Sequence, residues 1–441
     1  MNTAPPARIP TAPPAPTRAP FFRPGGGSRA TRMQLPLARM TGLTPAERDA
    51  IDRLADAPML AQVQSWAAIN SGTRNLDGVA TMAGMLADAF AALPGDIALV
   101  DPAPVTSVGA DGTTANLQHG RHLHLKVRPN AHTQMLFTGH MDTVYPADHP
   151  FQALTFRDDG TLNGPGVADM KSGLALMLAA LKSVEASPLA SRIGYEVVIN
   201  SDEETGSFSS AALIEEAARG KAAALTYEPA LPDGTLAGAR GGTGNFSIVV
   251  RGRSAHAGRN PEEGRNAVVA AADLALRLSK AGGPGLAVNP AKIEGGGPNN
   301  VVPDLAILRV NFRPAGPDDI ARAQAQIDAA IATVAAEHDV KIEVHGSFNR
   351  PPKPIDPGAA KLFDLVKNAG ADLGLAIGWR ATGGVCDGNN IAACGVPVVD
   401  TMGARGGAIH SPDEFLIVDS LAERAGLSAL TIMRIAEKGS L

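Results

Sequence analysis

Three short apolar runs in the first half of the chain each end in histidine or acidic residues. The runs lie at 134–138, 195–200 and 223–227, and they end in the polar segments 139–142, 201–204 and 227–229. A helical stretch at 170–186 separates the first two runs. Strands that alternate with helices indicate an α/β layer, and open α/β sheets bind ligands beyond the carboxyl ends of their strands. We therefore predict an α/β fold with a functional site where these strands end.

The segment from about residue 242 to 347 has a different order of elements. It predicts strand, helix, strand, strand, helix and strand in turn, at 246–253, 266–280, around Ile293, 305–312, 318–337 and 341–345. That order is the ferredoxin-like βαββαβ unit. In its second helix Ile320, Ile327, Ile331 and Val334 form one apolar stripe. We expect this segment to be a module inserted into the α/β domain.

The α/β pattern returns after residue 351, with a strand at 398–402 and a final helix from about Leu421. A chain of 441 residues, 44% of them apolar, is long enough for two cores, because single cores stop growing at about 250–300 residues. We predict a discontinuous catalytic α/β domain, with a mixed sheet and flanking helices, at 43–241 and 351–441. The inserted ferredoxin-like domain would occupy 242–350.

The charge and composition of the chain restrict the classes of molecule that it is expected to bind. The formal net charge is −5, so the concentrated basic surface that nucleic acid or an anionic membrane requires is not expected. No apolar run approaches the ~18–20 residues needed to cross a bilayer. Residues 1–42 are rich in Pro, Ala and Arg, which predicts a disordered extension, and they lack the apolar core of a secretory signal. We expect a cytoplasmic protein that acts on a small molecule.

Five residues at or near the predicted strand ends are of the types that bind zinc. Zinc takes imidazole nitrogen and carboxylate oxygen, and a catalytic zinc keeps one position open for water. The candidate ligands are His140, Asp169, Glu204, Glu228 and His410. Asp142 is close enough in sequence to orient the His140 ring, as carboxylates often do for metal-bound imidazoles. Considered alone, this pair also fits an ordinary polar strand end.

Two other polar segments have alternative interpretations. The adjacent Glu203 and Glu204 cost energy unless a cation or solvent compensates their charges, so they fit either a metal site or a solvated acidic turn. Segment 164–169 has part of the glycine pattern of dinucleotide loops. Asp169 stands where the third glycine would be and would repel phosphate, so we disfavour a dinucleotide site.

Two segments carry the pattern of a helix start. Thr44 and Glu47 flank Pro45 as N-cap and capping-box residues, which places the beginning of the folded chain near residue 43. Segment 411–414 has a similar pattern directly after His410. A helix beginning there would fix the position of this candidate ligand.

Six motifs, taken together and in order, resemble the M20 metallopeptidase family. They are His140-Met-Asp-Thr-Val, Gly164-Pro-Gly-Val-Ala-Asp-Met-Lys-Ser-Gly, Ser201-Asp-Glu-Glu-Thr-Gly-Ser, Tyr227-Glu-Pro, Ser254-Ala-His-Ala-Gly and Ile409-His-Ser-Pro. The resemblance covers the chain from about residue 45 to its end. The nearest groups are carboxypeptidase G2 (glutamate carboxypeptidase), acetylornithine deacetylase and succinyl-diaminopimelate desuccinylase.

The resemblance implies a role for each candidate ligand. One zinc ion would be held by His140 and Glu228, and the other by Glu204 and His410. Asp169 would bridge the two ions. Two Zn²⁺ per subunit are therefore expected, with Co²⁺ or Mn²⁺ as alternatives.

The resemblance also implies roles for the neighbours of these ligands. Asp142 would orient His140, and the peptide between Asp169 and Met170 would be cis. Glu203 would be the general base, taking a proton from the hydroxide-forming water between the metals and delivering it to the departing amine.

The inserted segment resembles the family's lid, which also forms the dimer contact. His256 would reach into the partner subunit's site and steady the oxyanion of the tetrahedral intermediate. Asn300 and Arg313 would hold the substrate's carboxylate. Alternate positions from 306 to 312 are apolar, which places Arg313 on the opposite face of the strand, and an arginine fork suits a carboxylate. We expect a homodimer through residues 242–350.

Two glycines complete the predicted site. Gly383 and Gly384 would leave backbone room beside the substrate, whereas the nearby Asp387 is interpreted as structural. The neighbouring Cys386 stands where relatives often have a small hydroxyl residue, a difference that carries no assigned role.

The implied function is that of a dinuclear zinc hydrolase that cleaves an amide bond next to a free carboxylate in a small substrate. Glutamate-releasing relatives carry a lysine just after the Glu-Pro strand end, and residues 230–239 contain none, so glutamate specificity is not expected. An N-acyl amino acid deacylase is an alternative to a carboxypeptidase. A non-catalytic metal- or ligand-binding member of the fold is the rival from another class, and a binding protein would have no need of Glu203.

Overall fold

The computed structural model describes residues 42–441, so the predicted extension lies, apart from Gly42, outside the described part of the chain. Its helices are α1 (Pro45–Leu54), α2 (Met59–Ala67), α3 (Leu76–Phe90), α4 (Ser172–Glu185), α5 (Ala211–Ala218), α6 (Ala267–Lys280), α7 (Pro317–His338), α8 (Pro357–Asp372), α9 (Asp387–Ala393) and α10 (Ser420–Lys438). None of the helices within residues 42–441 combines the length and the apolar character that a membrane crossing requires.

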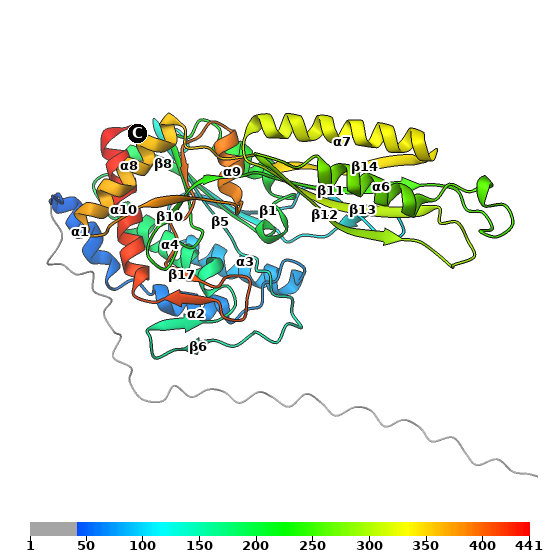
Figure 1. Ribbon diagram of the computed structural model, residues 1–441. Coiled ribbons are helices and arrows are strands. Elements are labelled where there is room, and N and C mark those ends of the chain that lie inside the picture. Colours follow the sequence, from blue (N-terminus) through cyan, green and yellow to red (C-terminus); the bar gives the residue numbers. More distant parts are fainter. Residues whose placement is uncertain (1–41) are drawn as a thin grey trace, which may run out of the picture. The chain divides into compact units, whose positions relative to one another are not determined.

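The larger sheet has six strands in the order β1-β4-β8-β5-β9-β16. Figure 1 labels three of them, β1, β5 and β8. Their bounds are β1 (Asp96–Val100), β4 (His122–Val127), β5 (Thr133–His140), β8 (Ile193–Asn200), β9 (Ala223–Thr226) and β16 (Val398–Val399). The four strands β8, β5, β9 and β16 are parallel neighbours, while β4 and β1 add antiparallel pairs at one edge. The predicted mixed α/β sheet is confirmed.

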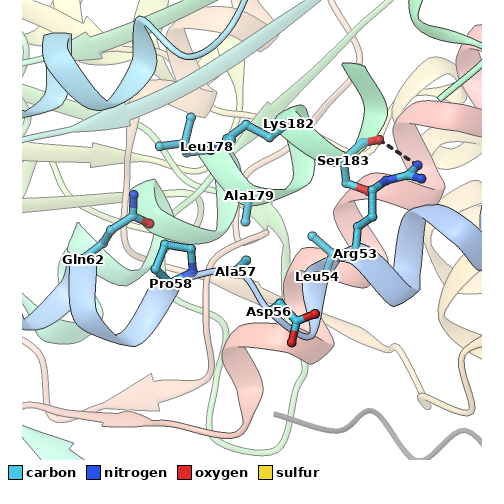
Figure 2. A pocket seen from close by; sticks show the side chains of 10 residues that line it. All are labelled: Arg53, Leu54, Asp56, Ala57, Pro58, Gln62, Leu178, Ala179, Lys182 and Ser183. Carbon is cyan, nitrogen blue, oxygen red and sulfur yellow. Dashed lines mark hydrogen bonds between the residues drawn. The ribbon is translucent and has the colours of Figure 1, made fainter. Parts of the chain in front are cut away.

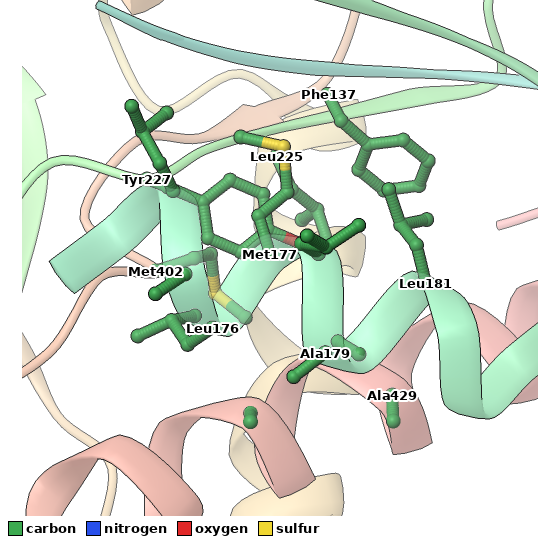
Figure 3. Close-up of a cluster of buried hydrophobic side chains, with 14 of the residues drawn as sticks. Phe137, Leu176, Met177, Ala179, Leu181, Leu225, Tyr227, Met402 and Ala429 are labelled. Carbon is green, nitrogen blue, oxygen red and sulfur yellow. The ribbon is translucent and has the colours of Figure 1, made fainter. Parts of the chain in front are cut away.

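Helix α4 lies in the hydrophobic core beside this sheet. Almost all of its side chains are buried, as expected for a helix that is apolar or small on every face. Phe137 of β5 and Leu225 of β9 lie on its sheet side, and Ala429 of α10 lies on the other (Figure 3). Covered on both sides, α4 fixes the turn that precedes it, which contains Asp169.

Four antiparallel strands in the order β12-β13-β11-β14 form a second sheet with a core of its own. Their bounds are β11 (Thr243–Arg251), β12 (Leu286–Gly295), β13 (Leu305–Pro314) and β14 (Lys341–Arg350). Helices α6 and α7 pack against β13, and the chain order is βαββαβ, so the ferredoxin-like unit is confirmed. The division into domains at residues 242 and 350 stays a prediction.

The two faces of β13 differ as the alternation of its residues predicts. Leu308, Val310 and Phe312 are buried in the core beneath α6 and α7. Arg309 and Arg313 lie on the opposite face.

The remaining strands form smaller sheets around the larger one. They are β2 (Val105–Val108) with β3 (Thr114–Leu117), β10 (Leu236–Arg240) with β15 (Trp379–Thr382), and the four strands β17 (Gly406–Gly407), β18 (Phe415–Ile417), β7 (Thr161–Asn163) and β6 (Thr155–Phe156). The hairpin of β2 and β3 contacts the second sheet, where Arg309 donates a 2.7 Å hydrogen bond to the Val108 carbonyl.

One of the two predicted helix starts is correct. Thr44 accepts from the Glu47 amide, and Glu47 accepts from the Thr44 amide at 2.7 Å, so α1 begins with the expected capping box. The prediction for segment 411–414 is wrong, because this segment is a turn that leads into β18. The carboxylate of Glu414 accepts hydrogen bonds from the amides of Ala168 and Asp169 and does not cap its own segment.

Candidate metal centre

Three adjacent strands bring the predicted ligands together. His140 is the last residue of β5, and β5 lies between β8 and β9 in parallel register. Glu203 and Glu204 are in the turn that follows β8, and Glu228 follows β9. Because the carboxyl ends of parallel neighbours lie at one edge of a sheet, these side chains converge. Asp169 joins them from the turn before α4, and His410 from the segment between β17 and β18.

The five predicted ligands form two half-sites that share one aspartate. In the first, His140 Nε2 lies 3.1 Å from Asp169 Oδ1 and 3.7 Å from Glu228 Oε2. In the second, His410 Nε2 lies 3.3 Å from Asp169 Oδ2 and 3.2 Å from Glu204 Oε2. Each half-site therefore has one imidazole, one glutamate and one oxygen of Asp169.

Asp142 connects the His140 ring with the turn that carries both glutamates. The Nδ1 atom of His140 lies 3.0 Å from the Asp142 carbonyl oxygen and 3.4 Å from its carboxylate. That carboxylate also accepts from the amides of Glu203 and Glu204, at 3.2 and 3.3 Å, and from the Thr73 hydroxyl at 2.7 Å. With Nδ1 held in this way, Nε2 of His140 faces the shared Asp169. Thr73 was not predicted, and nothing in its sequence context distinguishes it.

Glu414 holds the backbone of the shared aspartate. It accepts from the amides of Ala168 and Asp169 at 3.0 and 3.1 Å, and from the Tyr145 hydroxyl at 2.9 Å. The peptide between Asp169 and Met170 is cis, as predicted. Sequence reasoning noticed Glu414 but assigned it to a local cap, because no pattern reveals a contact across 245 positions.

The pKa shifts within the cluster show that its ionised carboxylates are unfavourable without a cation. Burial, with the charge of Asp169, raises the pKa of Glu204 to about 8. Burial raises the pKa of Glu203 to about 7. Hydrogen bonds to Asp169 and Glu204 raise the pKa of His410 to about 10. In the absence of metal these groups would share protons, and metal ligands must give those protons up.

The residues fit two divalent metal ions. Carboxylate oxygen and imidazole nitrogen are suitable donors, and each half-site offers three of them, which leaves a position for water. A buried oxygen of Glu228, Oε1, has no hydrogen-bond partner within the described part of the chain. An unpaired buried acceptor costs free energy that a cation would offset.

Arg350, the last residue of β14, contacts the predicted general base. Its Nη2 atom lies 2.8 Å from Glu203 Oε1 and donates to the Glu203 carbonyl at 3.0 Å and to Ser207 Oγ at 2.8 Å. It also lies 3.4 Å from Asp387, which accepts from Ser207 and Asn200. Sequence reasoning missed Arg350. Its place before two prolines, at the return to the α/β pattern, was the one available signal.

Comparisons with known proteins decide the family. Residues 136–434 match the model of peptidase family M20/M25/M40. The chain is 32% identical over 330 residues to carboxypeptidase G2 of Pseudomonas sp. (strain RS-16), covering 73% of this chain and 78% of that protein. This chain belongs to peptidase family M20.

Other members of the M20 family are similar over most of the chain. Succinyl-diaminopimelate desuccinylase of Verminephrobacter eiseniae (strain EF01-2) is 28% identical over 309 residues, which are 65% of this chain and 75% of that protein. A tripeptidase from Staphylococcus aureus subsp. aureus Mu50 superposes with a TM-score of 0.66 at 25% identity, covering 86% of this chain and 98% of that one. The M20 chain described here is a metal-dependent hydrolase.

The M20 fold is shared with a protein whose name describes two metals. The Bacillus subtilis YxeP protein, a dinuclear metal binding peptidase from the M20 family, has a TM-score of 0.59 at 16% identity and covers 88% of this chain and 99% of that one. At this identity the likeness shows the fold alone.

The three residues predicted in the inserted module lie apart from the centre; Arg313 is on β13, and His256 and Asn300 are in loops. His256 and Asn300 are exposed and adjacent, since the Ala257 amide donates to the Asn300 carbonyl. Arg313 is exposed, and its Nε donates to Asn311 at 2.8 Å. Within residues 42–441, none of the three makes a hydrogen bond or ion pair with the predicted ligands.

The two predicted glycines border open space. A Cβ atom on Gly383 would meet nothing within 4 Å, and one on Gly384 would approach Arg240 Nη1 no closer than 3.5 Å. The chain's own packing therefore does not require either glycine. Their predicted role beside a substrate is left as a prediction.

A cavity of about 320 Å³ lies away from the predicted residues, between α1, α2 and α4 (Figure 2). Arg53 crosses one side of it and donates to the Ser183 carbonyl at 3.2 Å. Its lining includes no histidine and a single carboxylate, that of Asp56. It therefore lacks the donors of a metal site.

Proposed function

We propose that this M20 protein uses two zinc ions to hydrolyse an amide bond next to a free carboxylate in a small substrate. The observation that carries the proposal is the pair of half-sites that share Asp169, with Glu203 beside them. His140 and Glu228 would hold one ion, and Glu204 and His410 the other. Bound there, two divalent ions would polarise the scissile carbonyl and lower the pKa of water.

Glu203 is the proposed general base and acid. Its carboxylate takes a proton from the water that adds to the carbonyl carbon. It then gives that proton to the amide nitrogen as the C–N bond breaks, so the products are a carboxylic acid and an amine. The Arg350 contact supports this role, because it holds both the carboxylate and the backbone of Glu203 in one orientation.

Asn300 and Arg313 are the proposed contacts for the substrate's carboxylate, and His256 the proposed donor to the oxyanion. Because His256 and Asn300 are exposed and make no contact with the centre of their own chain, we propose that the active unit is a homodimer in which His256 serves the partner's site. The inserted module offers a surface for pairing. Val269 and Leu276 on α6 are exposed to 52% and 60%, and Ile293 lies on the edge strand β12 at 41%.

The substrate class follows from the same residues. Without a lysine in 230–239, glutamate recognition has no cationic group in that segment. We propose an N-acyl amino acid or a dipeptide with a free carboxylate as the substrate, with deacylation and carboxypeptidase action as the two forms of one reaction.

A substrate panel tests the proposal. The metal-loaded protein would be incubated with N-acyl amino acids and dipeptides, with and without a chelator, and the released amine measured. We expect cleavage of at least one member, loss of cleavage with the chelator, and recovery on adding Zn²⁺. If two metals bind and no amide in the panel is cut, the proposed substrate class is rejected.

A further inference from the structure

The histidines of the two half-sites are held to different degrees. The His140 side chain is 1% exposed, and its Nδ1 atom lies 3.0 Å from the Asp142 carbonyl oxygen. The His410 side chain is 53% exposed, and its contacts with Asp169 and Glu204 use Nε2 alone. Among the described residues, none makes a hydrogen bond with the Nδ1 atom or the backbone of His410. The position of His410 therefore depends on the rest of its segment.

The backbone of that segment is in an unfavourable conformation. Its φ angle is 52° at Ala408 and 61° at His410, in the left-handed region that residues other than glycine seldom adopt. A conformation of this kind persists where surrounding contacts determine it. The contacts that hold the segment between β17 and β18 thus decide where the His410 ring lies.

Tyr145 makes such a contact from the segment that follows β5. Its hydroxyl donates to the Ser411 carbonyl at 2.8 Å, directly after His410 in the chain. The same hydroxyl has a second acceptor, Glu414 Oε2, at 2.9 Å, and Glu414 Oε1 accepts from the Asp169 amide at 3.1 Å. One hydroxyl therefore joins the segment of His410 to the turn of the shared aspartate.

The Tyr145 side chain is itself fixed in place. It is buried, and its ring centroid lies 5.3 Å from that of His149 and 5.2 Å from that of Phe151. Its carbonyl accepts from Asn70 Nδ2 at 3.1 Å. A side chain that is already immobile loses little conformational entropy when its hydroxyl makes a hydrogen bond. Tyr145 can therefore restrain the Ser411 carbonyl more firmly than a mobile surface residue could.

A second residue holds the later part of the same turn. Asn163 of β7 donates to the carbonyls of Pro412 and Glu414 at 3.0 and 2.7 Å. Both carbonyls lie beyond Ser411 in the chain. The side of the turn next to His410 is thus left to Tyr145.

We propose that Tyr145 is a positioning residue for the second half-site, and that its hydroxyl places His410 for metal binding through the Ser411 carbonyl. Within residues 42–441, Tyr145 makes no hydrogen bond with any of the five predicted ligands, so it would act through the segment and not on the metal. This role rests on the proposed function, since it presupposes metal ions at both half-sites.

A Co²⁺ titration tests this role without turnover. Metal-free protein would be equilibrated with a series of free Co²⁺ concentrations, and bound metal followed by dialysis and visible absorption. Tyr145→Phe keeps the ring and removes the hydroxyl. We expect one ion to bind as in the wild type and the other about 10-fold more weakly, as is typical when a residue that orients a metal ligand is changed. Tyr195→Phe, near the start of β8 and away from the centre, should match the wild type.

A double substitution tests the route through His410. His410→Ala removes a ligand of the second half-site and should leave one tightly bound Co²⁺. Because Tyr145 is proposed to act through His410, adding Tyr145→Phe to His410→Ala should not change the affinity for that ion. If it weakens this ion as well, the hydroxyl acts through Glu414 and Asp169, and the assignment to His410 is overturned.

Hydrolysis provides a separate measurement. The kcat of Tyr145→Phe should be low at limiting Co²⁺ and should return to the wild-type value when Co²⁺ saturates both half-sites. A kcat that stays low at saturation would overturn the positioning role. If Tyr145→Phe binds both ions like the wild type, or loses both equally, the inference is overturned whether or not any amide is cut. If it weakens one ion and the wild type cuts no amide, the inference stands and the proposed substrate class is rejected.

Discussion

The larger sheet and the inserted module differ in how firmly they hold their predicted site residues. Around the larger sheet, His140, Asp169, Glu204 and Glu228 lie within contact distance, and their backbone and rings are held by Asp142 and Glu414. In the inserted module, His256 and Arg313 are exposed: His256 Nδ1 accepts from the Gly258 amide, Arg313 Nε donates to Asn311, and the His256 backbone pairs with that of Val301. The predicted metal ligands are thus brought together within one chain. The predicted residues of the inserted module are not, and in our proposal they would need a second chain or a substrate.

The largest expected effect concerns Glu203, which lies beside the predicted metal ligands of the larger sheet. Glu203→Gln keeps the shape of the side chain and removes the base, so kcat should fall by about 10²–10⁴-fold, the range typical of a general base. Metal content should be unchanged. Glu216→Gln, the same substitution at an exposed site on α5, is the control. Retention of wild-type turnover by Glu203→Gln would remove this residue from the mechanism.

The next prediction tests whether His256 of the inserted module acts in the partner subunit's site. His256→Ala should lower kcat by about 10²–10³-fold if the side chain stabilises an oxyanion. Mixing it with Glu203→Gln should restore roughly a quarter of wild-type activity, because half of the dimers are mixed and each has one intact site. Sedimentation of the mixture would confirm that dimers form. No recovery from a mixture that does form dimers would contradict catalysis across the interface.

A smaller effect is expected where the two sheets meet. Arg350 ends a strand of the inserted sheet and holds Glu203, so it is a positioning residue. Arg350→Lys keeps the charge but cannot make all the contacts, and kcat should fall by about 10-fold with little change in KM. The control is Arg434→Lys on α10, which loses comparable contacts with Glu47 of α1 and Asp372 of α8. A rise in KM without a fall in kcat would assign Arg350 to substrate binding instead.

The sequence predicts the elements well where local patterns determine them. The apolar runs became β5, β8 and β9, and the stripe of Ile327 and Val334 became the buried side of α7. Convergence of His140, Glu204 and Glu228 was predictable too, because the carboxyl ends of parallel neighbours must lie together.

The sequence does not predict contacts made across the chain. Glu414 has the local pattern of a capping residue, but its carboxylate instead accepts hydrogen bonds from the amides of Ala168 and Asp169. Arg350 and Thr73 hold Glu203 and Asp142 through tertiary contacts that leave no periodic signal. Residues that position a catalytic group are therefore harder to find from sequence than the group itself.

The smallest effect concerns the stability of the sheet that carries the centre. Glu196 of β8 lies 2.6 Å from both His124 Nε2 and Lys221 Nζ. Although burial opposes it, these hydrogen bonds lower the pKa of Glu196 to about 2. A carboxylate whose pKa is lowered on folding stabilises the protein above its ordinary pKa, and this contribution is lost as pH falls through the folded value. Because solvent screens this partly exposed group, we expect about 1 kcal/mol at pH 7.

Glu196→Gln should therefore lower the free energy of unfolding at pH 7, and the difference from wild type should shrink as pH falls from about 5 to 3. Denaturant titrations at several pH values measure this difference. Glu216→Gln, which removes an exposed carboxylate from α5, should show no such trend. A difference that stays constant with pH would mean that packing, not charge, explains the effect. In that case the order of the larger sheet would not depend on this ion pair, and the contrast with the inserted sheet would rest on the metal centre alone.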